Sequence, residues 1–267
     1  MTRLCTLALL ALCALPLGAC KSMGEVTGDI TGSLGASDDR LPRDAALLRR
    51  YTAEWGQRYA QQPEDVRTAL TYARALRAQS QTAQAVAVLQ KLAIKNSSNR
   101  AVLAAYGKAL AEGGRLQEAA DVLARAHTPE QPSWSVLSSQ GSVADQMGDH
   151  QAAQNYYQAA LKIRPNEPSI LSNLGLSYAL GKQLPVAERT LRAANDSPQA
   201  DMRVRQNLAL VLALEGKFPE AEEVSRRDLS PMDAASNVAA IRRMIAQSDT
   251  WREIQKLDAG RKPRAAL

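Results

Sequence analysis

Side chains that commonly perform catalysis are scarce in this 267-residue chain. It has only two histidines, His127 and His150, and three cysteines. No nucleophile, general base and orienting group can be assembled from these residues, and there is neither a Gly-rich phosphate-binding loop nor a cluster of metal ligands. Both histidines fall at predicted turns, where we expect them to be surface residues. The sequence therefore predicts a protein that is not an enzyme and that uses no metal and no cofactor.

One cysteine has neighbours that indicate covalent modification. An apolar run from Leu4 to Leu17 leads into Gly18, Ala19 and Cys20. The run is shorter than the roughly 20 residues of a membrane-spanning helix and is typical of a secretory signal. Its end resembles the bacterial lipobox, in which the cysteine thiol is lipidated and becomes the mature N-terminus; an ordinary signal that ends beside a cysteine is the alternative. We expect residues 1–19 to be a lipoprotein signal peptide and Cys20 to be the lipidation site.

Residues 20–42 are rich in Gly, Ser, Thr and Asp and are predicted to be a flexible tether. As a random coil it would span about 25 Å, and fully extended about 75 Å. Lys21 stands where many Gram-negative lipoproteins carry an acidic inner-membrane signal, so the resemblance implies an outer-membrane anchor facing the periplasm. Since Cys5 and Cys13 lie in the removed segment, no thiol remains for a disulfide.

The remaining sequence is predicted to be all-α. Hydrophobic residues make up 45% of the chain but aromatic residues only 4%, because the apolar content comes mostly from Ala and Leu, which are strong helix formers. The formal net charge is +6, yet nucleic acid is not an expected partner of a secreted protein. Acidic peptide segments and anionic lipid remain possible partners of its basic surfaces.

A 34-residue period organises this helical sequence. Five units begin, without a gap, at Val66, Arg100, Trp134, Pro168 and Met202. Position 8 of the units is always small: Ala73, Gly107, Gly141, Gly175 and Ala209. Position 20 is always alanine: Ala85, Ala119, Ala153, Ala187 and Ala221. The turn at position 15 holds Gly114, Gly148 and Gly216, with Gly181 one place early. These slots resemble the tetratricopeptide repeat, a helical hairpin whose two helices cross closely at the small residues.

The resemblance implies a right-handed superhelix of about five tetratricopeptide helical hairpins with capping helices. The repeats are expected at residues 66–99, 100–133, 134–167, 168–201 and 202–235. Residues 43–65 are expected to form an N-terminal capping helix, and 236–267 a C-terminal capping helix followed by a frayed basic tail, because an open array exposes an apolar face at each end. Ser225 is a weak core residue at position 24, where four units carry Leu or Tyr.

In this family the first helices of the hairpins make the concave wall, which is where partners bind. The fourth and fifth units place a leucine ladder on that wall: Leu176, Leu180, Leu210 and Leu214. Exposed apolar patches usually mark interaction sites, although added helices or the chain's own tail could cover this one. Asn173 and Asn207 share position 6, where an amide can bond both polar groups of a peptide backbone, or can simply fill space. Together with Arg203 these residues form the predicted peptide-binding groove.

The first two units carry a basic stretch on the same wall, formed by Arg67, Arg74, Arg77 and Lys108. It is either a second binding surface or an ordinary solvated helix face.

A resemblance to a known family comes from one short segment. The residues from Asn237 to Met244, which read NVAAIRRM, look like the C-terminal pattern of the TadD family of lipoproteins. That family belongs to the tight-adherence (Flp) pilus secretion machine. The resemblance implies a pilotin-like role toward the secretin, with the secretin or pilus-assembly components as partners. A lipoprotein activator of peptidoglycan synthases and a substrate adaptor for a periplasmic protease are the alternatives on the same scaffold.

Overall fold

The computed structural model describes residues 41–260, with side chains as far as Gln247. This part of the chain is helical throughout, which confirms the all-α prediction, and an isolated bridge between Thr128 and Gln131 forms no strand. The helices are α2 (Ala45–Gln61), α3 (Val66–Ala78), α4 (Thr82–Lys95), α5 (Arg100–Glu112), α6 (Leu116–Ala124), α7 (Trp134–Gln146), α8 (His150–Ile163), α9 (Pro168–Leu180), α10 (Leu184–Asn195), α11 (Met202–Leu214), α12 (Phe218–Ser225) and α13 (Pro231–Gly260).

Each first helix of a hairpin starts where the sequence supplies a helix-initiating residue. Side chains of Asp65, Asn99, Ser133 and Asp201 accept hydrogen bonds from the first turns of α3, α5, α7 and α11. Helix α9 instead begins with Pro168, whose fixed φ suits the first helical position. These caps satisfy N–H groups that have no partner inside the helix. The four caps and Pro168 mark the five first-helix starts, which are 34 residues apart.

Close approach of the two helices explains the glycines at position 8. A Cβ atom on three of them would meet the position-24 side chain of the same hairpin: 2.6 Å from Leu123 at Gly107, 2.7 Å from Tyr157 at Gly141 and 2.5 Å from Leu191 at Gly175. Real Cβ atoms do not approach so closely. The fifth hairpin has Ala209 at this slot, opposite the small Ser225, whose buried hydroxyl donates to the carbonyl of Ala221 at 2.8 Å. Ser225 therefore fits the core.

The turn inside every hairpin needs one residue with positive φ at position 15. Gly114, Gly148 and Gly216 supply it with φ of 74°, 85° and 80°. In the fourth hairpin the expected glycine does not: Gly181 has a φ of −75°, and Lys182 takes the left-handed conformation at 62°. The length of the first helix thus determines that position 15 takes the positive φ. A glycine at position 14 does not shift this conformation by one residue.

The two ends of the array are covered by single helices. Helix α2 packs on α3, and the rings of Tyr59 and Tyr72 stack with centroids 5.4 Å apart. At the other end α13 packs on α11 and α12 through buried Val238 and partly buried Ile241. Helix α13 continues to Gly260, so the backbone carrying Arg252 and Lys256 is helical and not a frayed tail. The remaining basic residues, from position 261 onward, lie outside the described residues.

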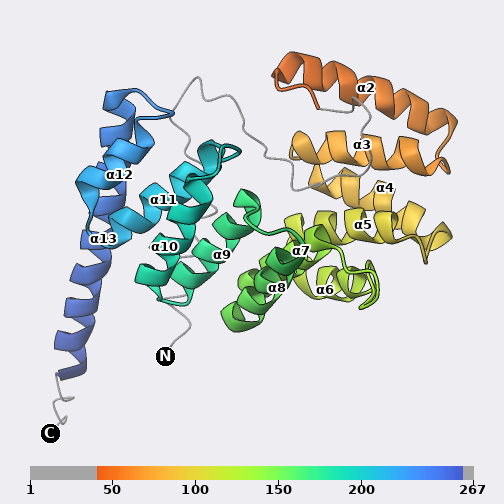
Figure 1. Ribbon diagram of the computed structural model, residues 1–267. Coiled ribbons are helices and arrows are strands. Elements are labelled where there is room, and N and C mark those ends of the chain that lie inside the picture. Colours follow the sequence, from red (N-terminus) through yellow and green to blue (C-terminus); the bar gives the residue numbers. More distant parts are fainter. Residues whose placement is uncertain (1–40, 261–267) are drawn as a thin grey trace, which may run out of the picture.

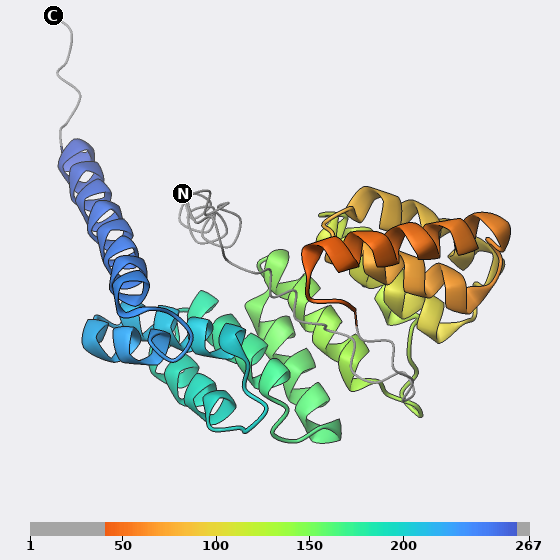
Figure 2. The ribbon, with the colours of Figure 1, turned by 90° about the horizontal axis from the view of Figure 1, so that it is seen from above.

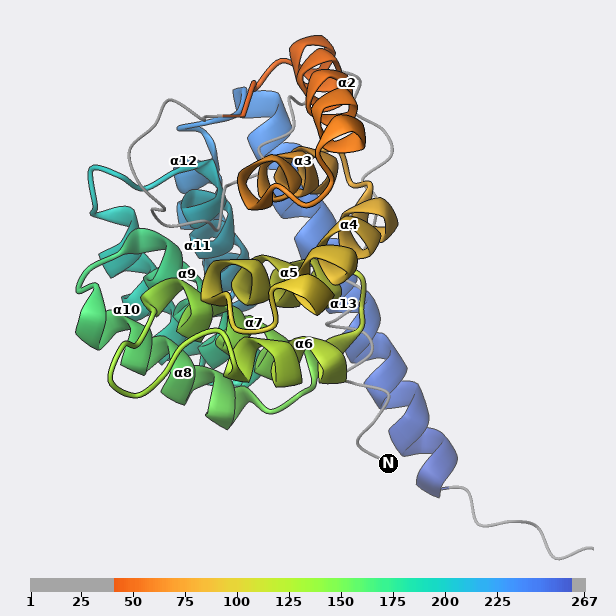
Figure 3. The ribbon, with the colours of Figure 1, turned by 90° about the vertical axis from the view of Figure 1, so that its right-hand side faces the viewer.

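The hairpins stack in sequence order into a curved, superhelical array (Figures 1 and 2). Each first helix also contacts the first helix of the next hairpin, from α3 through α5, α7 and α9 to α11, so these helices form a continuous wall. The view along the array shows α13 leaving the body at the C-terminal end (Figure 3). Between residues 41 and 260 no helix combines the length and apolar character that crossing a bilayer requires.

Candidate functional site: the wall of first helices

The leucine ladder lies on α9 and α11, which contact each other. All four leucines are half-buried, with part of each side chain accessible. None of them belongs to the buried clusters that hold the hairpins together. Helix α13 reaches the core of this region through Val238 and Ile241 and not through the ladder. The ladder is therefore a partly wetted apolar strip beside the core.

The two asparagines are hydrogen-bonded to the preceding hairpin. Asn173 donates to Ser138 Oγ at 3.4 Å, and Asn207 donates to Ser172 Oγ at 2.9 Å. An amide has two N–H groups and a carbonyl oxygen, so one such bond orients the side chain and uses one of its donors. Both asparagines are half-buried, as is Arg203 earlier on α11. These residues and the ladder share the walls of α9 and α11.

The structure does not bring the predicted basic stretch together as an exposed patch. Arg77 donates to Glu112 with two nitrogens, one of them at 2.7 Å, and its side chain is only 12% exposed. Lys108 is buried and donates to Ser135 Oγ at 3.0 Å. Arg67 is exposed and Arg74 half-buried. Side chains of the next hairpin engage Arg77 and Lys108, which the pattern within one unit could not reveal.

A buried polar cluster joins the third and fourth hairpins. Asp145 Oδ1 accepts a hydrogen bond from Ser177 Oγ at 2.8 Å and lies 2.9 Å from His150 Nδ1. The Tyr157 hydroxyl also bonds to this carboxyl group. Burial raises the pKa of Asp145 despite these bonds, and it raises the pKa of the enclosed Tyr157 well above its usual value.

Neither histidine is the simple surface residue expected from the sequence. Both are half-buried, and His127 Nε2 lies 3.1 Å from Gln140 Oε1 across the connection between the second and third hairpins. In the cluster the carboxylate stands between the serine and the histidine, so the imidazole cannot take the proton of Ser177. The geometry does not resemble a nucleophile activated by a base. His127 contacts the next hairpin, whereas His150 joins the two helices of its own hairpin through Asp145.

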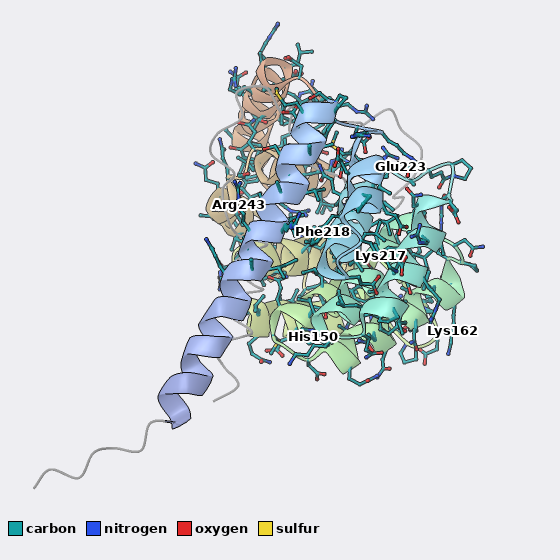
Figure 4. All side chains as sticks on the ribbon, turned by 90° about the vertical axis from the view of Figure 1, so that its left-hand side faces the viewer. His150, Lys162, Lys217, Phe218, Glu223 and Arg243 are labelled. Carbon is teal, nitrogen blue, oxygen red and sulfur yellow. The ribbon has the colours of Figure 1, made fainter. Side chains whose placement is uncertain are left out.

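A partly buried ion-pair network joins the fourth and fifth hairpins around Lys217 (Figure 4). Glu188 accepts from Lys217 at 2.7 Å and from Arg192 at 2.7 Å. Arg192 also pairs with Glu220, and Lys217 with Glu215. The bond from Lys217, opposed by partial burial and helped by Arg192, lowers the pKa of Glu188 from 4.5 to about 2.

This depressed pKa predicts an acid-dependent loss of stability. The ionised form of Glu188 stabilises the fold above about pH 4.5, and that contribution is lost as the pH falls from 4.5 toward about 2. Because the surrounding cations are solvated, we expect it to be on the order of 1 kcal/mol. Urea unfolding at neutral and acidic pH should show Glu188→Gln less stable at neutral pH and equal to wild type in acid. The exposed Glu223→Gln control should follow wild type throughout; a constant gap for Glu188→Gln would contradict the assignment.

Comparison with known proteins identifies the hairpin. The tetratricopeptide repeat family model matches residues 70–133 and 139–201. These hairpins are tetratricopeptide repeats. No curated protein sequence matches the chain. Arrays of this repeat bind other proteins, so the chain is a protein-binding scaffold.

Solved structures share the fold at low sequence identity. PilW, a type IV pilus biogenesis factor, superimposes with a TM-score of 0.61 and 17% identity over 73% of this chain and 91% of PilW. A chain of the APC/C hetero-tetramer Cut9–Hcn1 gives 0.58 and 18% over 72% of this chain. IFIT1, solved with m7Gppp-AAAA, gives 0.59 and 14% over 73%. This chain spans 39% and 50% of the latter two. Because such different proteins share one architecture, the fold does not identify the binding partner. The residues on the wall of first helices are the evidence for its chemistry.

Proposed function

We propose that this protein is an outer-membrane, lipid-anchored periplasmic scaffold that binds a protein segment during assembly of a tight-adherence (Flp) pilus secretion machine, with a pilotin-like role toward the secretin. The observation that carries the binding role is the leucine ladder, which stays partly accessible on two adjacent first helices. The pilus assignment rests on the TadD-like segment from Asn237 to Met244. PilW supports it only by offering the same fold in a pilus factor.

Lipidation at Cys20 and location at the outer membrane are part of this proposal. Cys20 and the tether as far as residue 40 lie outside the described residues, and their roles are inferred from the sequence. Lipidation would keep the repeat body near the membrane, since several acyl chains anchor a protein firmly. The first helix begins at Ala45, so the tether would separate the helical body from the anchor without confining its orientation.

The wall suggests what kind of segment fits it. Leu176 and Leu210 are 34 residues apart and repeat the same position on α9 and α11, as do Leu180 and Leu214, so apolar side chains of a partner can pack across both helices. The oriented amides of Asn173 and Asn207 sit at matching steps beside them. A partner segment with apolar anchors and an accessible backbone, in an extended or irregular conformation, satisfies both features.

Crosslinked pull-down of the native lipoprotein from envelope membranes tests the function. Leu176→Asp combined with Leu210→Asp places charges on the ladder and should reduce recovery of secretin or pilus-assembly subunits by at least about tenfold, because burying an unpaired carboxylate is costly. Arg189→Asp combined with Arg227→Asp is the control, since both arginines are exposed away from the ladder.

Each outcome separates the candidates. Recovery of peptidoglycan synthases or of a periplasmic protease in place of pilus components would overturn the pilus role and support an alternative scaffold. Unchanged recovery with the double aspartate variant, verified as folded by circular dichroism, would show that the partner does not use the ladder.

A further inference from the structure

The outer side of the N-terminal helix α2 combines exposed cations with apolar groups. Its inner side packs on α3 through Leu48 and Thr52, which are buried. On the opposite side Leu47 is 52% exposed, and Arg43 and Arg50 are exposed. Exposed leucine beside arginine is unusual at the end of a repeat array, where a capping helix normally shows a polar outer face.

Two aromatic residues border this outer side. Tyr51 and Trp55 are half-buried, with ring centroids 5.9 Å apart, and the guanidinium of Arg58 lies 4.6 Å from the centre of the Trp55 ring. The acids on this helix are already engaged: Asp44 caps the first turn, and Glu54 pairs with Arg58. No hydrogen bond or ion pair within residues 41–247 engages Arg43 or Arg50. Tryptophan beside arginine is typical of membrane–water interfaces, whereas the hydroxyl of Tyr51 is buried in the protein.

Charge is distributed unevenly along the array. Residues 41–130 carry 13 Lys and Arg against 8 Asp and Glu, whereas residues 131–247 carry 12 of each. The excess positive charge therefore lies in the N-terminal half, where α2 is the outermost helix (Figures 1 and 2). A positive end of this kind is complementary to a negatively charged surface.

We infer that the outer face of α2, made by Arg43, Leu47 and Arg50, docks the repeat body on an anionic phospholipid bilayer. The role of this contact rests on the proposed lipid anchor at Cys20. The tether between the two is about 25 Å long as a coil, so the face is held at high local concentration near the membrane, and a weak contact suffices. Docking through α2, at one end of the array, leaves the leucine ladder at the far end accessible to a partner.

Vesicle co-sedimentation of the unacylated chain from residue 21 onward tests the inference. This chain keeps the whole described body and lacks the lipid, so any binding comes from the protein surface. We expect binding to vesicles that contain phosphatidylglycerol, little binding to phosphatidylcholine alone, and loss of binding in high salt. Arg43→Gln combined with Arg50→Gln should lower partitioning by about thirtyfold, because each arginine contributes about 1 kcal/mol near an anionic surface. Leu47→Ser should lower it several-fold with the charge unchanged.

A matched control removes the same charge elsewhere. Arg189 and Arg227 are exposed in the neutral half, and their double glutamine variant should bind as wild type does. An equal loss in both double variants, or equal binding to both vesicle types, would refute docking through α2. The Leu176→Asp, Leu210→Asp variant should still bind vesicles. Failure of vesicle binding with an intact pull-down would remove only this inference, and the reverse result would remove only the proposed partner.

Discussion

Replacing Gly175 by valine is expected to destabilise the protein by about 3 kcal/mol, a large fraction of an ordinary domain's stability. A Cβ at this position would lie 2.5 Å from Leu191 Cγ, and Leu191 is fully buried, so it has no space into which to move. Valine adds two further methyl groups to the same crossing. The better helix propensity of valine compared with glycine offsets only a few tenths of a kcal/mol. Urea unfolding followed by circular dichroism measures the change.

A double-mutant cycle isolates this contact from other effects of the substitution. Leu191→Ala alone should cost about 3 kcal/mol because it opens a cavity. Combined with Gly175→Val it should cost clearly less than the sum of the two, since the new methyl groups occupy the space that leucine vacates. The fifth hairpin already carries such a pair, Ala209 opposite Ser225. Additive costs in the cycle would show that Gly175 is required for another reason.

The sequence alone predicted the parts of the fold that depend on one hairpin. Small residues at position 8 and large ones at position 24 are determined by the crossing of two helices joined by a short turn, so they recur in nearly every unit. The turn was predicted less well in the fourth hairpin. There Lys182 accepts a left-handed conformation that Gly181 was expected to provide, because helix register outweighs the modest strain at a single residue.

Contacts between hairpins were the part that the sequence could not predict. Arg77 with Glu112, Lys108 with Ser135 and the two asparagines with their serines each join residues 27 or 35 positions apart. The two asparagine–serine pairs repeat after 34 residues, but a pattern read within single units does not show that position 6 of one hairpin bonds to position 5 of the preceding hairpin. The pairs of Arg77 and Lys108 depend on which polar residues two neighbouring units carry. The basic stretch was therefore wrongly expected to be an exposed surface, whereas the leucine ladder, which has no such partners, stayed partly accessible.

Alanine in place of Asp145 is expected to cost about 3 kcal/mol, since the change leaves buried hydroxyl groups without an acceptor. Ser177 is completely buried and donates to this carboxylate, and the Tyr157 hydroxyl, also buried, bonds to it. Asparagine keeps a carbonyl oxygen for one of these donors, so Asp145→Asn should cost much less. Asp196→Ala, at an exposed position, should change the free energy of unfolding by less than about 0.5 kcal/mol. Equal costs for the alanine and asparagine variants would show that the hydrogen bonds of Asp145 do not matter.

The stability of wild type relative to Asp145→Asn, measured against pH, gives a second test. The change with pH is expected to run in the opposite direction to that expected for Glu188. Burial raises the pKa of Asp145, so the folded protein holds this proton to higher pH than the unfolded chain does. The contribution of Asp145 to stability is then greatest in acid and declines as the pH rises through the ordinary aspartate range, about 4, toward the raised pKa. The amide that replaces the carboxyl group in the variant does not titrate. The stability of wild type relative to Asp145→Asn should therefore decrease from acid to neutral pH, and an increase would mean that His150 and Ser177 outweigh the cost of burying the charge.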